Sequence, residues 1–137
     1  LPRGEVLLSK EPLVGMIHES ISFNRDRGVW WPYLAVIMPD HIHMLVAFPP
    51  EPGMRKVISG WKHYLARKAG VVWQRDFFDH RLRRNESREE KAHYIKMNPV
   101  RKGLVARAED WPHTWEWWES GGEGAWLRLE VTPGQVR

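Results

Sequence analysis

Two strand-like runs separated by a tight turn constrain the fold of this chain more than any other feature of its sequence. Residues 30–38 are rich in aromatic and branched side chains, Pro39-Asp40 is a turn signal, and residues 41–48 are again strand-like. Neighbouring strands joined by so short a connection pair in the antiparallel sense. The chain is therefore predicted to contain a β-hairpin.

Amphipathic helices are predicted on either side of this hairpin in the sequence. Apolar residues recur at helical spacing from Glu11 to Arg27 and again from Met54 to Ala69, and the second segment carries many Lys and Arg residues. Val71 to Phe78 has the composition of a short strand. Trp73 and Gln74 are interpreted as residues near the start of this strand rather than as DNA contacts. Helices mixed with an antiparallel hairpin predict an α+β sandwich, with helices on one or both faces of a small sheet.

A third helix is predicted to begin at Ser87. Ser87 is a suitable N-cap, and Glu90 follows three residues later in the capping-box pattern. The helix is expected to end near Asn98, because Pro99 disfavours helical geometry at the residue before it.

Size and composition predict one soluble domain over residues 1–137, with the tail after about residue 119 left unassigned. The chain is 42% hydrophobic and 28% charged, and no apolar run approaches the roughly 18 residues that a membrane span needs. The first ten residues lack the pattern of a secretory signal. Because the chain has no cysteine, disulfides and thiolate metal sites are excluded, and the cytoplasm, with the nucleoid, is the expected location.

The positive charge of the chain is concentrated in one stretch. Residues 55–107 hold 15 of the 21 Lys and Arg residues but 5 of the 17 acidic ones, so this stretch carries +10 and the remainder −6. Such asymmetry indicates contact with a polyanion, although a solvated helix face would have a similar pattern. The nine tryptophans belong mostly to the core, but aromatic residues among Arg and Lys also suit base stacking.

His41 and His43 form a candidate metal site. They are two residues apart in an apolar strand, so both imidazoles emerge on one face while Ile42 and Met44 point to the other. Imidazole is a common ligand of transition metals, which makes Mn²⁺ at least as suitable here as Mg²⁺. A pair of structural histidines remains the alternative.

Tyr94 and Asn98 form a second candidate element. Four residues apart on a helix, they share one face, so the amide oxygen of Asn98 could complete a metal shell beside the phenol of Tyr94. A tyrosine hydroxyl becomes a useful nucleophile when its proton is removed or a nearby cation stabilises the phenolate. The alternative is that Tyr94 is a packed helix residue.

Three motifs, in order, resemble a known family. The segments "VIMPDHIHMLVAF", "WQRDFFDHRLR" and "YIKMNPVRKGLV" are similar to those of the REP-associated tyrosine transposases, relatives of the single-tyrosine HUH transposases of small insertion sequences. The resemblance runs from about Leu13 to Trp111. It implies an HUH fold of ferredoxin-like type, in which a central antiparallel sheet carries a histidine pair facing a tyrosine on a helix.

The resemblance also implies roles for individual residues. His41 and His43 match the catalytic, metal-binding histidines, Tyr94 matches the nucleophile, and Asn98 falls where a polar third metal ligand is expected. The activity implied is cleavage and strand transfer of single-stranded DNA through a covalent 5′-phosphotyrosine, with Mg²⁺ or Mn²⁺ as cofactor. The substrate would be hairpin-forming repeat DNA, bound by a monomer or a homodimer.

Basic residues near the motifs are the candidates for contact with the DNA backbone. His80 is interpreted as a hydrogen-bonded structural residue rather than as a DNA contact. The DNA-binding candidates are Arg55, Lys56, Lys62, Arg67, Lys68, Arg81, Arg83, Arg84, Arg101 and Lys102.

The start of the chain departs from the family pattern. Family members have a β-strand before the first helix, whereas this sequence begins close to that helix, so the first family strand is expected to be missing and to leave an exposed sheet edge. A non-cleaving protein that binds DNA hairpins is therefore an alternative function. Another is a metal-dependent hydrolase that activates water, with Tyr94 merely structural.

Overall fold

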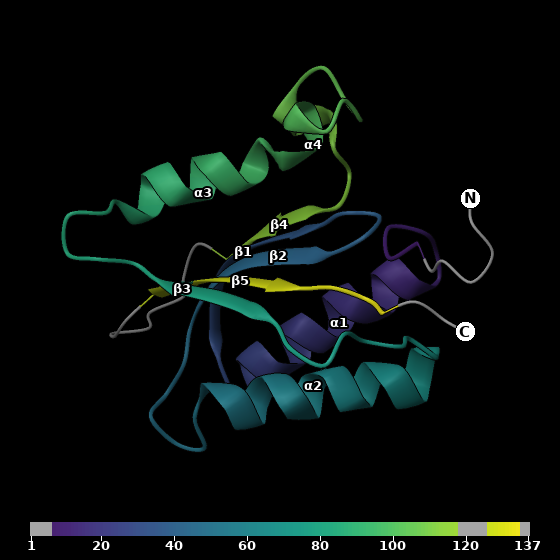
Figure 1. Ribbon diagram of the computed structural model, residues 1–137, viewed down its shortest axis with the longest axis vertical. Helices are drawn as coiled ribbons and strands as arrows, with labels where there is room; N and C mark the ends of the chain where they lie inside the picture. Colours follow the sequence, from purple (N-terminus) through teal and green to yellow (C-terminus); the bar gives the residue numbers. More distant parts are fainter. Residues whose placement is uncertain (1–6, 118–125, 135–137) are drawn as a thin grey trace.

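The computed structural model describes residues 7–117 and 126–134, which form a five-stranded antiparallel sheet with helices on both faces (Figure 1). The strand order is β3-β5-β2-β1-β4. A short 3₁₀ helix precedes β4. The elements, in chain order, are α1 (Leu13–Asp26), β1 (Trp31–Ile37), β2 (Ile42–Ala47), α2 (Met54–Ala69), β3 (Phe78–Arg81), α3 (Arg88–Lys96), α4 (Asn98–Arg101), β4 (Thr114–Glu116) and β5 (Trp126–Val131).

The sheet separates two helical layers. α1 and α2 cover one face, and α3 with the short α4 lies on the other (Figure 1). This arrangement confirms the predicted α+β sandwich. The predicted hairpin is also confirmed, since β1 pairs with β2 in a register that sets Val36 opposite His43.

The end of α2 and the start of α3 have local causes in the sequence. α2 has the predicted bounds and ends at Gly70, whose φ of 72° is readily adopted only by glycine. At the start of α3, the hydroxyl of Ser87 accepts a hydrogen bond from the backbone N–H of Glu90 at 3.2 Å. α3 ends at Lys96, and the expectation that Pro99 keeps Asn98 out of helical geometry is wrong. Asn98 begins α4, and Pro99 lies in its first turn, where its missing N–H costs no helical hydrogen bond.

The strand predicted over Val71–Phe78 is wrong. Most of that segment lies outside the sheet, with only an isolated bridge between Trp73 and Pro133, and β3 starts at Phe78. The ammonium of Lys62 donates to the carbonyl of Gln74 at 2.7 Å, so a side chain satisfies a backbone group that a strand neighbour would otherwise bind.

The exposed edge expected from a missing first strand does not form beside the histidine strand. β5, which comes late in the sequence, pairs with β2 on one side and with β3 on the other. If β5 preceded α1, the order β5-α1-β1-β2-α2-β3 would be the β-α-β-β-α-β order of a ferredoxin-like sandwich. β5 thus takes the place of a first strand.

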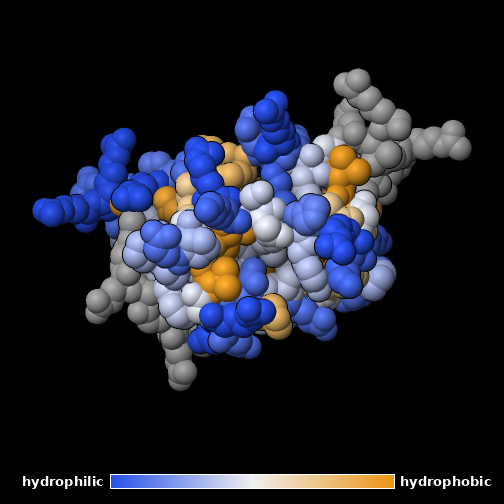
Figure 2. All heavy atoms as spheres, turned by 90° about the horizontal axis from the view of Figure 1, so that it is seen from below, coloured by the Kyte–Doolittle hydropathy of each residue, from blue (hydrophilic) through white to orange (hydrophobic). Residues whose placement is uncertain are grey.

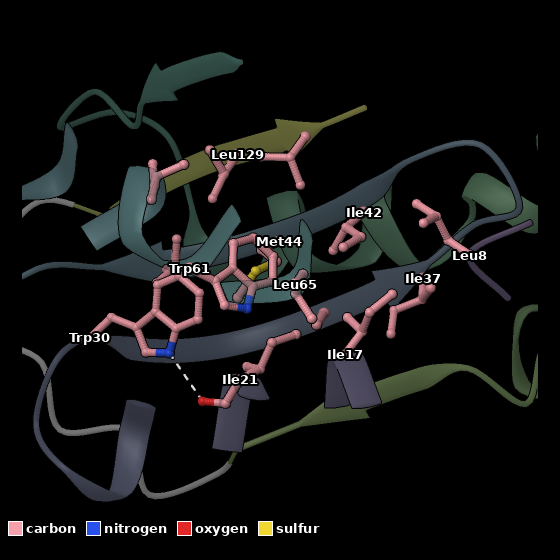
Figure 3. Packing of buried hydrophobic residues seen from close by; sticks show 14 of the residues in the cluster. Leu8, Ile17, Ile21, Trp30, Ile37, Ile42, Met44, Trp61, Leu65 and Leu129 are labelled. Atoms are coloured by element: carbon pink, nitrogen blue, oxygen red, sulfur yellow. Dashed lines mark hydrogen bonds between the residues drawn. The ribbon is translucent and has the colours of Figure 1, made fainter. Parts of the chain in front are cut away.

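The larger hydrophobic core fills the space between the sheet and the α1–α2 layer (Figure 3). Trp30 is fully buried, and its indole N–H donates to the carbonyl of Ile21 at 3.0 Å. The Trp61 ring meets the Trp30 ring edge-on, with the centroids 5.0 Å apart. A smaller cluster, including Leu34, Leu45 and Ile95, joins the other face of the sheet to α3.

The tryptophans of the tail pack over the sheet wherever the structure describes them. Trp115 and Trp117 pack against the larger core, and Trp111 and Trp126 against the smaller cluster. Trp118 lies outside the described residues. Of the helices described, none combines the length and the apolar character that crossing a membrane requires.

Candidate active site

Side chains from β2, β5 and the α3–α4 segment surround one hollow of about 330 Å³. Side chains of β5 alternate between buried apolar residues, such as Leu129 in the larger core, and the partly exposed Arg128 and Glu130, which line the hollow. The hollow therefore lies on the face of the sheet opposite the larger core. Its lining consists of His43, Tyr94, Asn98, Arg101, Lys102, Arg128 and Glu130.

His43 is the most deeply placed of these residues, with 3% of its surface exposed. As the alternation predicts, Ile42 and Met44 point into the core on the other face. The amide nitrogen of Asn98 lies 2.7 Å from Nδ1 of the His43 ring. Burial, followed by the charges of His41 and two arginines, lowers the pKa of His43 to about 3. The ring is therefore neutral near pH 7 and has a lone pair to offer.

The carboxylate of Asp40 orients the ring of His41. Its Nδ1 lies 2.9 Å from Oδ1 of Asp40, whereas its Nε2 is buried without a hydrogen-bond partner among the described residues. A carboxylate bound to one ring nitrogen fixes the tautomer and leaves the other nitrogen free for a metal.

Glu130 of β5 is the third donor, and the motifs did not identify it. Its Oε1 lies 3.6 Å from Nε2 of His41 and 3.9 Å from Nδ1 of His43. One ligand atom from each of the three residues lies within 4.8 Å of the others. The signal that could have found Glu130 is the alternation of Leu127, Leu129 and Val131 with polar or amphipathic residues.

This donor set fits a divalent transition metal. Two imidazoles and a carboxylate are the ligand types that Mn²⁺ and similar ions accept. The buried Nε2 of His41, which has no hydrogen-bond partner in the described part of the chain, is a polar atom that a ligand would satisfy. The amide nitrogen of Asn98 contacts the His43 ring beside this group, and the role of the Asn98 oxygen as a metal ligand stays a prediction.

Tyr94 faces the hollow from α3. Its side chain is 47% exposed, and the guanidinium carbon of Arg101 lies 4.1 Å from the centroid of its ring. The guanidinium carbon of Arg128 approaches the same ring to 5.8 Å. α3 ends at Lys96, between Tyr94 and Asn98. Because Met97 keeps helical backbone angles, both residues still face the hollow, as predicted.

The structure brings only two of the predicted DNA-binding residues, Arg101 and Lys102, to the hollow. Lys62 is buried and donates to backbone carbonyls. Arg81 lies in β3, and Arg83 and Arg84 follow it in the turn before α3. The remaining candidates lie on α2, across the sheet from Tyr94: Arg55, Lys56, Arg67 and Lys68 (Figure 1). The DNA contacts stay predictions.

His80 has the structural environment that the sequence predicted for it. Its Nε2 lies 3.1 Å from Oε1 of Glu86, and the same carboxylate oxygen accepts the backbone N–H of Arg83. The pair therefore holds the turn between β3 and α3.

A small antiparallel sheet with helices on both faces is an α+β fold consistent with the HUH transposases, and a helix-borne tyrosine opposite two strand-borne histidines fits that class. The chain is 30% identical over 104 residues to the REP-associated tyrosine transposase of Escherichia coli K12, with 69% of this chain and 59% of the relative covered. A Haemophilus influenzae protein with the same family name is 27% identical over 126 residues, with 77% of this chain and 72% of the relative covered.

These comparisons confirm the family that the three motifs predicted: the chain belongs to the REP-associated tyrosine transposases. It spans about three fifths of the length of the Escherichia coli relative. No family model matches the chain, and no solved structure matches it significantly.

Proposed function

We propose that this protein cleaves and rejoins single-stranded DNA, with Tyr94 as the nucleophile and a divalent metal held by His41, His43 and Glu130. The observation that carries the proposal is the convergence of Tyr94 with His43, Asn98 and Glu130 around one hollow. A tyrosine nucleophile needs a polarised phosphate beside it, and a histidine pair with a carboxylate is suited to hold the metal that binds that phosphate. The relatives are named transposases, which agrees with this chemistry.

The proposed cleavage exchanges one phosphate ester for another. The Tyr94 hydroxyl loses its proton, and its oxygen forms a bond to the phosphorus of a DNA phosphodiester. The bond between phosphorus and the 3′ oxygen breaks, and that oxygen leaves with the electron pair and takes up a proton. The products are a 5′-phosphotyrosine and a free 3′-hydroxyl. Because the ester bond is conserved, a 3′-hydroxyl can later reverse the step and join strands without a high-energy cofactor.

The protein's own residues prepare this step in distinct ways. Asp40 orients His41, and Asn98 holds the ring of His43, so both histidines are fixed before DNA binds. Arg101 packs over the Tyr94 ring and limits the positions of the phenol. Bound at this group, Mg²⁺ or Mn²⁺ would supply Lewis-acid polarisation of the phosphate and stabilise charge on the leaving oxygen.

The proposed substrate is DNA that forms a hairpin beside a single-stranded segment. The names of the relatives associate them with REP sequences, and the positive charge of residues 55–107 suits a nucleic acid partner. An open hollow of about 330 Å³ in front of Tyr94 suits an exposed phosphate of a single strand.

A denaturing-gel assay tests the proposal, with hairpin DNA labelled at either end and Mn²⁺ or Mg²⁺ present. Wild type should give a slow-migrating covalent adduct that retains the label of the 3′ fragment, together with a free fragment ending in a 3′-hydroxyl. Tyr94→Phe should bind DNA with nearly unchanged affinity and give no adduct, because only the nucleophilic oxygen is lost.

Tyr64→Phe is the matched control, because Tyr64 is also 47% exposed but lies on α2. This variant should form the adduct at the wild-type rate. Cleavage retained by Tyr94→Phe would refute the tyrosine as nucleophile and favour an activated water. DNA binding without any cleavage by wild type would favour the non-cleaving hairpin-binding protein.

A further inference from the structure

Arg128 is a charged residue of the site that has no acidic partner among the residues that the structure describes. Leu127 and Leu129, its neighbours in β5, are buried, and Leu129 belongs to the larger core, so the alternation of the strand places Arg128 on the face of the hollow. Among the described residues no carboxylate lies within ion-pair distance of its guanidinium. Its Nε is buried without a hydrogen-bond partner among those residues.

The guanidinium of Arg128 is held in place by aromatic rings instead. Its central carbon lies 5.0 Å from the centroid of the Phe78 ring and 5.8 Å from that of Tyr94. Contacts of this kind orient a planar guanidinium without neutralising its charge. A fixed, partly buried cation without a counter-charge destabilises the free protein, and binding of an anion relieves this destabilisation.

The charges around Arg128 select an anionic ligand. Three residues that line the hollow carry positive charge, namely Arg101, Lys102 and Arg128, whereas Glu130 is the acidic residue there. Glu130 faces the histidine pair and would be engaged by the metal. The positive charge of the other three therefore remains available to a ligand in the hollow.

We propose that Arg128 is a catalytic residue that binds the non-bridging oxygens of the phosphate attacked by Tyr94. This inference rests on the proposed function and adds to it a phosphate subsite supplied by β5. A guanidinium can give two parallel hydrogen bonds to a phosphate. Because Arg128 approaches the Tyr94 ring itself, a phosphate in line with the phenol oxygen lies within its reach, and negative charge that develops on the non-bridging oxygens is stabilised.

A substrate without the phosphate charge provides the test. Single-turnover cleavage is measured on DNA with a normal scissile phosphate and on DNA with a neutral methylphosphonate at that position. With normal DNA, Arg128→Ala should cleave about 100-fold or more slowly than wild type, the size of effect seen when one transition-state donor is removed. Arg128→Lys should be intermediate, because it keeps the charge and loses the paired hydrogen bonds.

The methylphosphonate comparison separates phosphate binding from a purely structural role. We define the penalty as the fold-reduction in cleavage rate that the methylphosphonate causes. Because Arg128→Ala no longer has the interaction with the charged phosphate to lose, the penalty should be at least about tenfold larger for wild type than for the variant. Equal penalties in the two proteins, or wild-type cleavage of normal DNA by Arg128→Ala, would overturn the inference. If Arg128→Ala does not fold, as judged by circular dichroism, the same comparison with Arg128→Lys decides.

Arg88→Ala is the matched control. Arg88 also packs over aromatic rings, 4.3 Å from the centroid of Tyr33 and 5.0 Å from that of Trp126, but it does not line the hollow. Its removal should leave the cleavage rate and the methylphosphonate penalty unchanged. Absence of any adduct with wild type would instead contradict the proposed function, so the two failures are distinguishable.

Discussion

At the scale of single residues, the candidate metal group depends on one residue that is remote in sequence. His41 and His43 supply two ring nitrogens, and Asp40 and Asn98 orient these rings. A pair of imidazoles leaves a divalent ion with few protein ligands. Glu130 adds a charged oxygen 3.6 Å from His41, so it should contribute much of the affinity for the metal.

We expect Glu130→Gln to weaken Mn²⁺ binding by at least about tenfold, because the amide loses the negative charge while keeping the shape of the side chain. Isothermal titration of the protein with Mn²⁺ measures the change. Glu109→Gln, which alters an exposed carboxylate paired with Arg107, should bind Mn²⁺ as wild type does. An unchanged affinity in Glu130→Gln would exclude this carboxylate from the metal group.

The sequence predicted the residues of the site that belong to local motifs. His41 and His43 are recognisable from their spacing in a strand, and Tyr94 and Asn98 from their spacing on a helix. Glu130 and Arg128 could not be placed in the same way, because their position depends on the pairing of β5 with β2. That pairing joins residues far apart in the chain, and no local pattern specifies it.

At the scale of elements, β5 contributes both to the larger core and to the hollow. One face of the strand contributes Leu129 and Val131 to the larger core, and the other contributes Arg128 and Glu130 to the hollow. Helices α1, α2 and α3 and the β1–β2 hairpin were predictable from periodicity, capping and turn residues, whereas α4 was not. The short strands β3 and β4 were not, because their stability comes from their neighbours in the sheet.

The turn between β3 and α3 depends on Glu86. Its carboxylate accepts the backbone N–H of Arg83 at 2.8 Å and lies 3.0 Å from Nζ of Lys91 and 3.1 Å from Nε2 of His80. The hydrogen bond from Arg83, followed by those from Lys91 and His80, lowers the pKa of Glu86 to about 2 from its usual 4.5. Because the folded-state pKa is depressed, the stabilisation is complete above pH 4.5 and is lost as the pH falls toward 2.

We therefore expect Glu86→Gln to melt at a lower temperature than wild type at pH 7, and we expect this difference to shrink as the pH falls from 4.5 toward 2. Thermal unfolding followed by circular dichroism over this range measures it. Glu51→Gln, at an exposed loop carboxylate, controls for the loss of one negative charge. A difference between Glu86→Gln and wild type that stays constant with pH would show that the ionised carboxylate does not stabilise the turn.

At the scale of the whole molecule, the two faces of the sheet carry different side chains. The α3–α4 face holds Tyr94 and the candidate metal group, whereas the opposite face is formed by α1 and the basic α2 (Figure 1). Figure 2 shows the lower face of the molecule, where hydrophilic side chains surround smaller apolar areas. The basic residues of α2 lie across the sheet from Tyr94. Any contact that they make with DNA should therefore affect binding and not the reaction proposed at Tyr94.

For this reason we expect the double variant Arg67→Ala, Lys68→Ala to weaken DNA binding without changing the cleavage rate of the saturated complex. Each lost phosphate contact should reduce the slope of log affinity against log salt by about 0.7 for single-stranded DNA. Fluorescence anisotropy over a series of salt concentrations gives both values. Arg107→Ala, whose charge is already paired with Glu109 and Asp110, is the control. An unaltered slope in the double variant would show that this end of α2 does not contact DNA.

The central claim is that one tyrosine of this protein becomes covalently attached to a DNA 5′-phosphate. The most direct test is to isolate the adduct formed with single-stranded hairpin DNA and Mn²⁺, digest both components, and locate the phosphonucleotide by peptide mass spectrometry. The chain has three tyrosines, so the assignment is unambiguous. We expect the modification on Tyr94 alone. A modification on Tyr33 or Tyr64, or cleaved DNA without any modified peptide, would contradict it.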